Sequence, residues 1–129
     1  MIVVDSSAFI AIQRREPEAE AFSRVLALAE SPAMAAATYL ECAIVASRAA
    51  DGRAVLDEWI RARRFAVVPV DHALAQLAAD AFARYGKGRH PAGLNFGDCF
   101  AYALARSLNA PLLFKGDDFA RTDVLRVGP

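Results

Sequence analysis

The chain has 129 residues, the size of one domain, and we expect a single domain over residues 1–129. Its formal net charge of zero excludes a protein that holds nucleic acid by bulk electrostatics, so any such contact has to come from local basic patches. No apolar run approaches the ~20 residues of a membrane-spanning helix, and the first residues lack the basic region of a signal peptide. We therefore expect a cytoplasmic protein without membrane contact.

Short apolar runs alternate with segments that have apolar residues at helical spacing. In chain order we predict a strand at 2–4, helices at 8–14 and 17–29, a strand at 33–37, helices at 39–50 and 53–64, a strand at 66–70, a helix at 71–85, a loop at 86–97, a helix at 98–108, a strand at 112–114 and an edge strand at 125–127. The run 33–37 is ambiguous, because alanine is a poor strand former; we interpret it as a strand because a helix follows at once.

This alternation predicts an α/β domain around a parallel sheet. Ligands of such sheets bind at the carboxyl ends of the strands. Asp5 follows the first strand, and Asp117 and Asp118 follow the strand at 112–114. These acids share one rim if their strands are near neighbours.

Five acidic residues stand where the chain is expected to turn: Asp5, Glu41, Asp98, Asp117 and Asp118. Carboxylates that converge from distant parts of a chain repel one another unless a cation holds them together. If they meet, they form a site for a hard metal ion. The chemistry of such a site is attack of a metal-activated water on a phosphodiester.

Each of these acids also has a purely structural interpretation. Glu41 completes a capping box that begins at Thr38. Asp98 falls at the third position of a helix, where the helix dipole favours an acid. Asp5 and the pair Asp117–Asp118 stand where N-caps are expected. The spacing alone leaves both interpretations open.

Four segments resemble the PIN-domain ribonucleases, and within them the VapC toxins of VapBC toxin–antitoxin pairs. The segments are Ile2–Ala8, Thr38–Glu41, Gly93–Phe100 and Leu112–Phe119. Their order, their spacing and the total length match from end to end, and 93–100 is the most specific. The resemblance implies one PIN domain, an α/β/α sandwich with a short, mainly parallel central sheet.

By position, Asp5, Glu41 and Asp98 match the three central acids of that family. The resemblance implies that Asp5, Asp98 and a fourth acid hold Mg²⁺, or Mn²⁺, and that Glu41 binds or orients a water. It further implies a metal-dependent endoribonuclease that hydrolyses RNA and leaves a 5′-phosphate and a 3′-hydroxyl.

The fourth acid is open. Many members have an acid, a spacer and a second acid before the phenylalanine, whereas here Gly116 takes the earlier place and Asp117 and Asp118 are adjacent. Both are therefore candidates for catalysis and for the metal. By the same resemblance, a hydroxyl of Ser6 or Ser7 assists the site.

Four basic side chains lie beside these motifs and are candidates for binding RNA phosphates: Lys87, Arg89, His90 and Lys115. The resemblance also implies a homodimer and a VapB-type antitoxin, which binds a groove on the helices around 22–29 and 39–50. Two alternatives remain. One is a non-catalytic PIN-like module that binds RNA or a partner; the other is a receiver-like signalling domain, although Asp5 lacks the acidic neighbours of a receiver.

Overall fold

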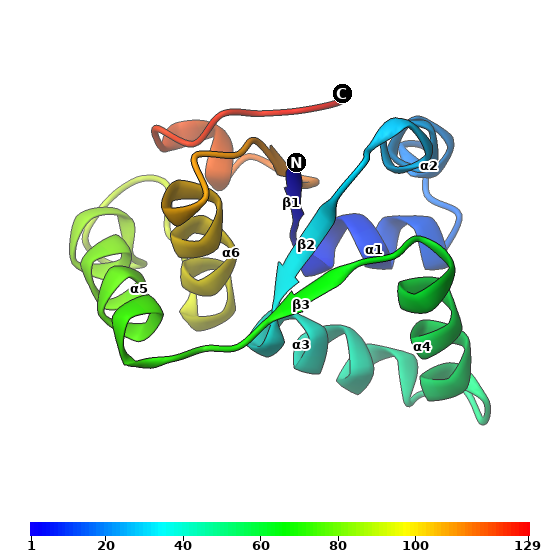
Figure 1. Ribbon diagram of the computed structural model, residues 1–129. Helices are drawn as coiled ribbons and strands as arrows, with labels where there is room; N and C mark the ends of the chain where they lie inside the picture. The colour runs from blue at the N-terminus through cyan, green and yellow to red at the C-terminus, as the bar shows by residue number, and fades with distance from the viewer.

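The centre of the computed structural model, which describes residues 1–129, is a sheet of four parallel strands in the order β3–β2–β1–β4 (Figure 1). The strands are β1 (Ile2–Val4), β2 (Pro32–Ala35), β3 (Ala66–Val68) and β4 (Leu112–Leu113). The chain extends the sheet from β1 to β3 in one direction and then places β4 on the other side of β1. The carboxyl ends of β1 and β4 therefore flank the point where the strand order reverses, which is where sheets of this kind bind ligands.

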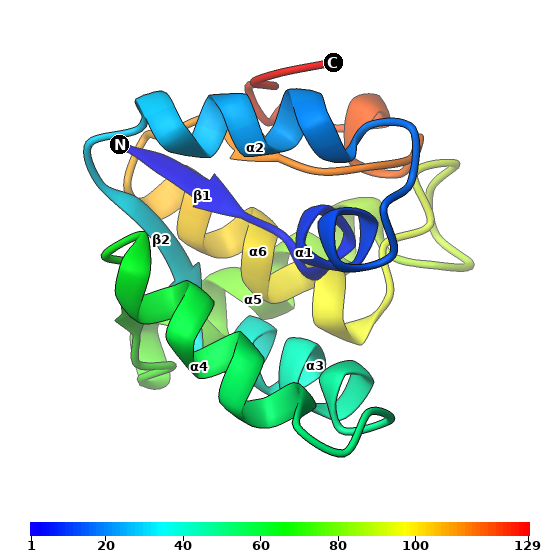
Figure 2. The same cartoon turned by 90° about the vertical axis from the view of Figure 1, so that its right-hand side faces the viewer.

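Helices cover both faces of the sheet. They are α1 (Ser6–Gln13), α2 (Ala19–Leu28), α3 (Ala36–Ala46), α4 (Gly52–Ala62), α5 (His72–Tyr85), α6 (Phe96–Ser107) and the 3₁₀ helix η1 (Phe119–Arg121). Figure 1 shows α5 and α6 on one side of the sheet, and Figure 2 shows α1, α2 and α4 in front with α5 and α6 behind. The predicted α/β/α sandwich is confirmed.

The first strand, β1, is apolar at every position because helices cover both of its faces. Val3 packs with α5 and α6 in the larger core, whereas Ile2 and Val4 face α1 and α2 with Phe22 and Leu26. Successive side chains of a strand point to opposite faces, so a strand covered on both sides must be apolar at every position. Burial of each such side chain stabilises the fold by about 1.5–3 kcal/mol.

Most predicted elements are present, but two boundaries differ in a way that bears on function. The helix predicted from Tyr39 begins at Ala36, directly after β2 and without a loop, and Ala35 is its N-cap. The helix predicted over 98–108 begins two residues earlier, at Phe96, and this start gives Asp98 the third helical position that was expected for it. The predicted edge strand at 125–127 is reduced to one bridge, between Arg126 and Leu112.

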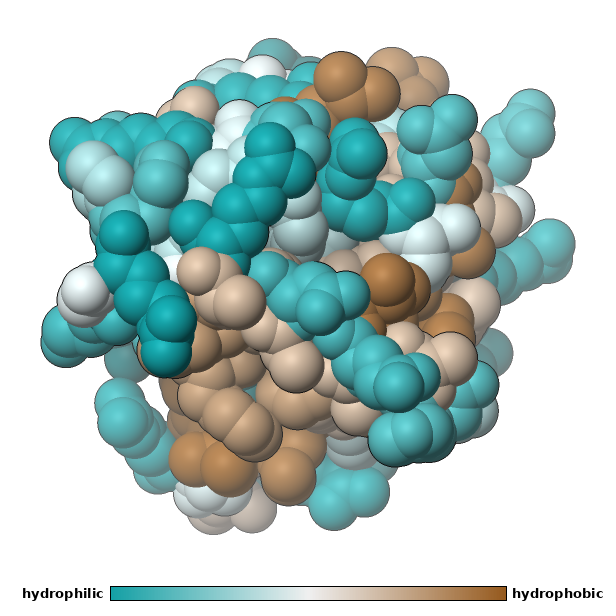
Figure 3. Space-filling view, turned by 90° about the vertical axis from the view of Figure 1, so that its left-hand side faces the viewer, coloured by the Kyte–Doolittle hydropathy of each residue, from teal (hydrophilic) through white to brown (hydrophobic).

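An apolar groove of about 520 Å³ lies between α5 and α6. It is lined by alanine, cysteine and phenylalanine side chains, among them Phe82, Phe96 and Phe100, and Phe96 is 81% exposed. Figure 3 shows brown, hydrophobic side chains gathered on this side of the molecule. None of the helices combines the length and the apolar character needed to span a membrane.

Candidate active site

Asp5, directly after β1, is the most buried acid of the chain, with 3% of its surface exposed. Its Oδ2 accepts a hydrogen bond from the Ser7 backbone N–H at 3.0 Å, so Asp5 does cap α1, as its structural interpretation requires. Its Oδ1 is buried and has no hydrogen-bond partner. Burial, together with the negative charge of Asp118, raises the pKa of Asp5 above its usual range. The cap therefore accounts for only one of the two carboxylate oxygens.

Glu41 does not form the capping box that its structural interpretation predicts. A capping box would need Thr38 as the N-cap of α3, but the N-cap is Ala35, and no side chain caps this helix. Glu41 instead lies in the second turn, and its Oε1 is buried without a hydrogen-bond partner. Burial, and then the charges of Asp5 and Asp98, raise the pKa of Glu41 to about 7. The capping-box interpretation is therefore wrong for this residue.

Asp98 forms the cap that its structural interpretation predicts, and it is also influenced by the charges of Asp5 and Asp118. Its Oδ2 accepts from the Asn95 backbone N–H at 3.0 Å, and the Asn95 side chain accepts from the Asp98 N–H at 2.9 Å, which completes a capping box at the start of α6. The hydrogen bond from Asn95 lowers the pKa of Asp98. Burial, together with the charges of Asp5 and Asp118, outweighs it and raises that pKa to about 6.

The N-terminus of α6 also contacts Glu41. A Cβ on Gly97 would lie 2.0 Å from Glu41 Oε2, so the carboxylate occupies the space that any larger residue would need. A glycine at a helix start permits such an approach. This contact was not predicted, although a glycine beside a candidate acid was the available signal.

Of the two adjacent acids after β4, the structure brings Asp118 to the cluster. Its charge contributes to the raised pKa values of Asp5 and Asp98, whereas Asp117 makes no such contribution. Asp118 precedes η1, but its side chain forms no capping hydrogen bond. Gly116, with a φ of +105°, turns the chain in a conformation that other residues rarely adopt. An acid at position 116 would thus be strained.

The ends of β1 and β4 are tied together beside this cluster. The Ser7 hydroxyl accepts a hydrogen bond from the Lys115 backbone N–H at 3.0 Å. Of the two serines expected to assist the site, Ser7 therefore fixes the position of the β4 loop. The part of Ser6 in the site stays a prediction.

The basic residues proposed to bind RNA are placed unequally. Lys87 and Arg89 are exposed on the loop before Asp98. His90 Nδ1 instead accepts from the Ala92 N–H at 3.0 Å. That nitrogen organises its own loop and is not free to contact a phosphate.

Lys115 is held by two acids. Its Nζ lies 3.1 Å from a carboxylate oxygen of Glu16 and 3.0 Å from one of Glu18. These ion pairs raise the pKa of Lys115 and compete with any phosphate for its charge. Its contact with RNA stays a prediction, and it would require these pairs to open.

The four acids suit a divalent cation by their chemistry, although they do not form a closed cage. No three acidic, histidine or cysteine side chains are arranged as a ready-made metal site. In favour of a cation, two buried carboxylate oxygens, on Asp5 and Glu41, lack any partner. Carboxylate oxygens of this kind are the donor type that Mg²⁺ and Mn²⁺ prefer, and the pKa values of Asp5, Glu41 and Asp98 are all raised.

The fold and the acids define a class of protein. The model of the PIN domain family matches residues 2–125. The chain therefore belongs to the PIN-domain family. Its relatives include Ribonuclease VapC28 of Mycobacterium tuberculosis, which is 50% identical, with 97% of this chain and 96% of the relative covered. Ribonuclease VapC of Mycolicibacterium smegmatis is 48% identical, with 98% and 99% covered. Within the PIN domains, the chain is a member of the VapC ribonuclease family.

Solved structures agree on the fold. Mycobacterium tuberculosis VapC20, a toxin that cleaves the sarcin-ricin loop, superposes with a TM-score of 0.77 at 17% identity, and both chains are covered completely. A toxin–antitoxin complex from Klebsiella pneumoniae also gives 0.77, at 16% identity, with 98% of this chain and 97% of that one covered. At such identities these likenesses show the fold alone.

Proposed function

We propose that this protein is a metal-dependent endoribonuclease toxin that hydrolyses RNA and is inhibited by a VapB-type antitoxin. Ribonuclease activity is what the names of its relatives state at 48–50% identity. The observation that carries the metal dependence is the pair of buried, unpartnered oxygens, Asp5 Oδ1 and Glu41 Oε1, within one group of acids. A receiver-like domain does not fit, because the family and the fold belong to a different class.

Asp5, Asp98 and Asp118 would hold the cation, since each reaches the cluster from a different element. When bound, Mg²⁺ or Mn²⁺ supplies an activated water and neutralises the charge that develops on the phosphate oxygens. The Glu41 carboxylate contacts Gly97 at the start of α6 and is influenced by the charges of Asp5 and Asp98, so it would orient the attacking water by a hydrogen bond. The water oxygen would form a new bond to phosphorus, the phosphorus–O3′ bond would break, and a proton from the water would pass to O3′, which leaves a 3′-hydroxyl and a 5′-phosphate.

RNA would approach over the loop before α6. Lys87 and Arg89 are exposed there and offer charge to backbone phosphates. Because the net charge of the chain is zero, such local contacts must supply the electrostatic attraction. We place the protein in the cytoplasm, where RNA substrates are found.

An antitoxin and a second copy of the chain are the proposed protein partners. Several solved structures of the same fold are toxin–antitoxin complexes, including VapBC-1 from Haemophilus influenzae. Leu40 and Ile44, one turn apart on α3, are 58% and 59% exposed, so the predicted antitoxin surface does present apolar side chains. The apolar groove between α5 and α6 is the surface that we propose for the homodimer.

The test is cleavage of total RNA by purified protein, with Mg²⁺, with Mn²⁺ or with EDTA. Asp98→Asn is the informative variant, because asparagine keeps an oxygen for the capping hydrogen bond while it loses the charge. We expect the wild type to cut only with metal and the variant not to cut. Cleavage that is equal in EDTA would contradict the metal dependence. Binding of RNA without any cleavage would instead identify the non-catalytic module.

A further inference from the structure

Asp118 has no contact of its own that explains its position. Its side chain is exposed and forms no hydrogen bond in the structure. Residues 115–118 are all exposed, and Gly116 adds conformational freedom to the turn. A carboxylate on such a loop is placed only by the backbone on either side of it. The anchors of that backbone therefore determine how well the proposed cation site is formed.

Anchors upstream of Asp118 end three residues before it. Phe114 is fully buried, and the Lys115 N–H donates to Ser7 Oγ at 3.0 Å. Downstream, Phe119 is buried, and its ring lies 5.2 Å from that of Phe114. These contacts hold the loop to the core, but they do not fix its position relative to Asp98 on α6.

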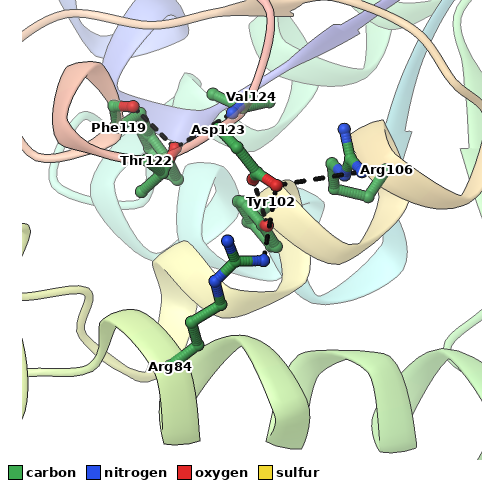
Figure 4. Close-up of polar contacts among 7 residues, drawn as sticks. All are labelled: Arg84, Tyr102, Arg106, Phe119, Thr122, Asp123 and Val124. Atoms are coloured by element: carbon green, nitrogen blue, oxygen red, sulfur yellow. Dashed lines mark hydrogen bonds and ion pairs between the residues drawn. The ribbon is translucent and has the colours of Figure 1, made fainter.

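The link to α6 is made by Asp123. The Tyr102 hydroxyl donates a hydrogen bond to Asp123 Oδ1, while Arg84 and Arg106 approach Oδ2 at 3.5 and 3.8 Å (Figure 4). We call these four residues the Asp123 anchor. Tyr102 lies one turn after Asp98 on α6. A hydrogen bond from Tyr102 and an ion pair with Arg106 thus join the helix that carries Asp98 to the segment that carries Asp118.

The segment between Asp118 and Asp123 is held in place by hydrogen bonds, so the position of Asp123 bears on that of Asp118. The Thr122 hydroxyl donates to the Phe119 carbonyl at 2.7 Å and accepts from the Val124 N–H at 3.2 Å (Figure 4). Arg121 Nη1 donates to the Pro91 carbonyl at 3.0 Å and so joins η1 to the loop before α6.

We propose that Asp123 and Tyr102 are positioning residues that set the Asp118 carboxylate against Asp98 in the cation site. The inference rests on the proposed function, since it assumes that these acids bind a divalent ion. It adds residues that lie outside the acid cluster and touch neither metal nor substrate. Partners that orient a metal ligand typically contribute about 10–100-fold to metal affinity.

The experiment measures Mn²⁺ affinity by isothermal titration calorimetry, well below the unfolding temperature, for Asp123→Asn and Tyr102→Phe. A matched control is Asp57→Asn on α4, because Asp57 also accepts from a tyrosine hydroxyl, that of Tyr39, and pairs with an arginine, Arg53, at 3.1 Å. Unfolding temperatures in EDTA are recorded for all variants. A purely structural role would lower those temperatures without changing Mn²⁺ affinity.

We expect the Mn²⁺ dissociation constant to rise about tenfold in both anchor variants and to stay within about twofold of wild type in Asp57→Asn. RNA cleavage at saturating RNA should fall in the anchor variants with little change in KM. Unchanged Mn²⁺ affinity in Tyr102→Phe and Asp123→Asn would overturn the proposal, whatever their stability. Absence of Mn²⁺ binding by the wild type would instead overturn the proposed function on which it rests.

Discussion

The close approach of Gly97 to Glu41 allows a substitution that acts on one carboxylate without deleting it. A Cβ added at Gly97 would lie 2.0 Å from Glu41 Oε2 and 2.5 Å from Cδ, whereas ordinary contact begins at 3.4 Å. In Gly97→Ala the carboxylate must therefore move by about 1.4 Å. A glutamate side chain has the rotamer freedom to do so.

The fold itself should tolerate this change. Gly97 lies in the first turn of α6, and its φ is outside the left-handed region that favours glycine. Alanine in a helix is more favourable than glycine by about 0.5–1 kcal/mol, which offsets part of the cost of moving the carboxylate. We therefore expect the unfolding temperature in EDTA to remain close to that of wild type.

Activity should respond far more than stability. A misplacement of about 1 Å at a reacting centre costs on the order of 100-fold in rate, so we expect kcat of Gly97→Ala for RNA cleavage to fall by about that factor. The double variant Gly97→Ala/Glu41→Ala should have the same kcat as Glu41→Ala. Gly97→Ala acts only by displacing the Glu41 carboxylate, so it has no effect once that carboxylate is absent. Wild-type kcat in Gly97→Ala, or additive losses in the double variant, would refute the role assigned to Glu41.

Two further predictions concern the charge of the cluster. The pKa of Glu41 is raised from 4.5 to about 7, so its contribution to stability is complete below pH 4.5 and is lost as the pH rises through 7. In EDTA, Glu41→Gln should thus have a higher free energy of unfolding by urea than wild type at pH 8. That free energy should also change less with pH between 4.5 and 7 in the variant. Identical pH dependence in the two proteins would count against the raised pKa. Asp118→Asn should lower RNA cleavage by roughly 10–100-fold, whereas Asp117→Asn should leave it within about twofold of wild type. Equal losses of RNA cleavage in the two variants would contradict the assignment of Asp118, and not Asp117, to the site.

The sequence predicted the layers of the fold because its patterns are local. Ile2–Val4 is apolar at every position, and a strand buried on both faces requires this. The helix predicted at 71–85 is present over His72–Tyr85, and Asp71 caps it by accepting a 2.8 Å hydrogen bond from the Leu74 N–H. The strand predicted at 33–37 is present as β2 over Pro32–Ala35, because pairing with β1 and β3 outweighs the weak strand propensity of alanine, whereas residues 36 and 37 already belong to α3.

The site was predicted less completely, because similar patterns have different outcomes in different contexts. Thr38 and Glu41 have the spacing of a capping box, as do Asn95 and Asp98, but only the second pair forms one. The difference is the point at which each helix begins, and for α3 this depends on its direct junction with β2. The choice between Asp117 and Asp118 likewise depends on the backbone around Gly116, which sequence spacing does not specify.

Lys115 shows a third limit. Its position beside the fourth acidic motif predicted a contact with phosphate, but Glu16 and Glu18 lie about a hundred residues earlier in the chain and pair with it. Glu16 and Glu18 lie in the connection between α1 and α2, and the fold brings this connection next to the residue that follows β4. Only the folded arrangement reveals them.

The central claim is that Asp5, Asp98 and Asp118 together bind a divalent ion. Diffraction from crystals soaked in Mn²⁺, recorded for anomalous scattering, tests it most directly. We predict an anomalous peak within coordination distance of oxygens from all three side chains, with Glu41 nearby. A peak at another place on a protein that still cleaves RNA, or cleavage without any peak among these acids, would contradict the account.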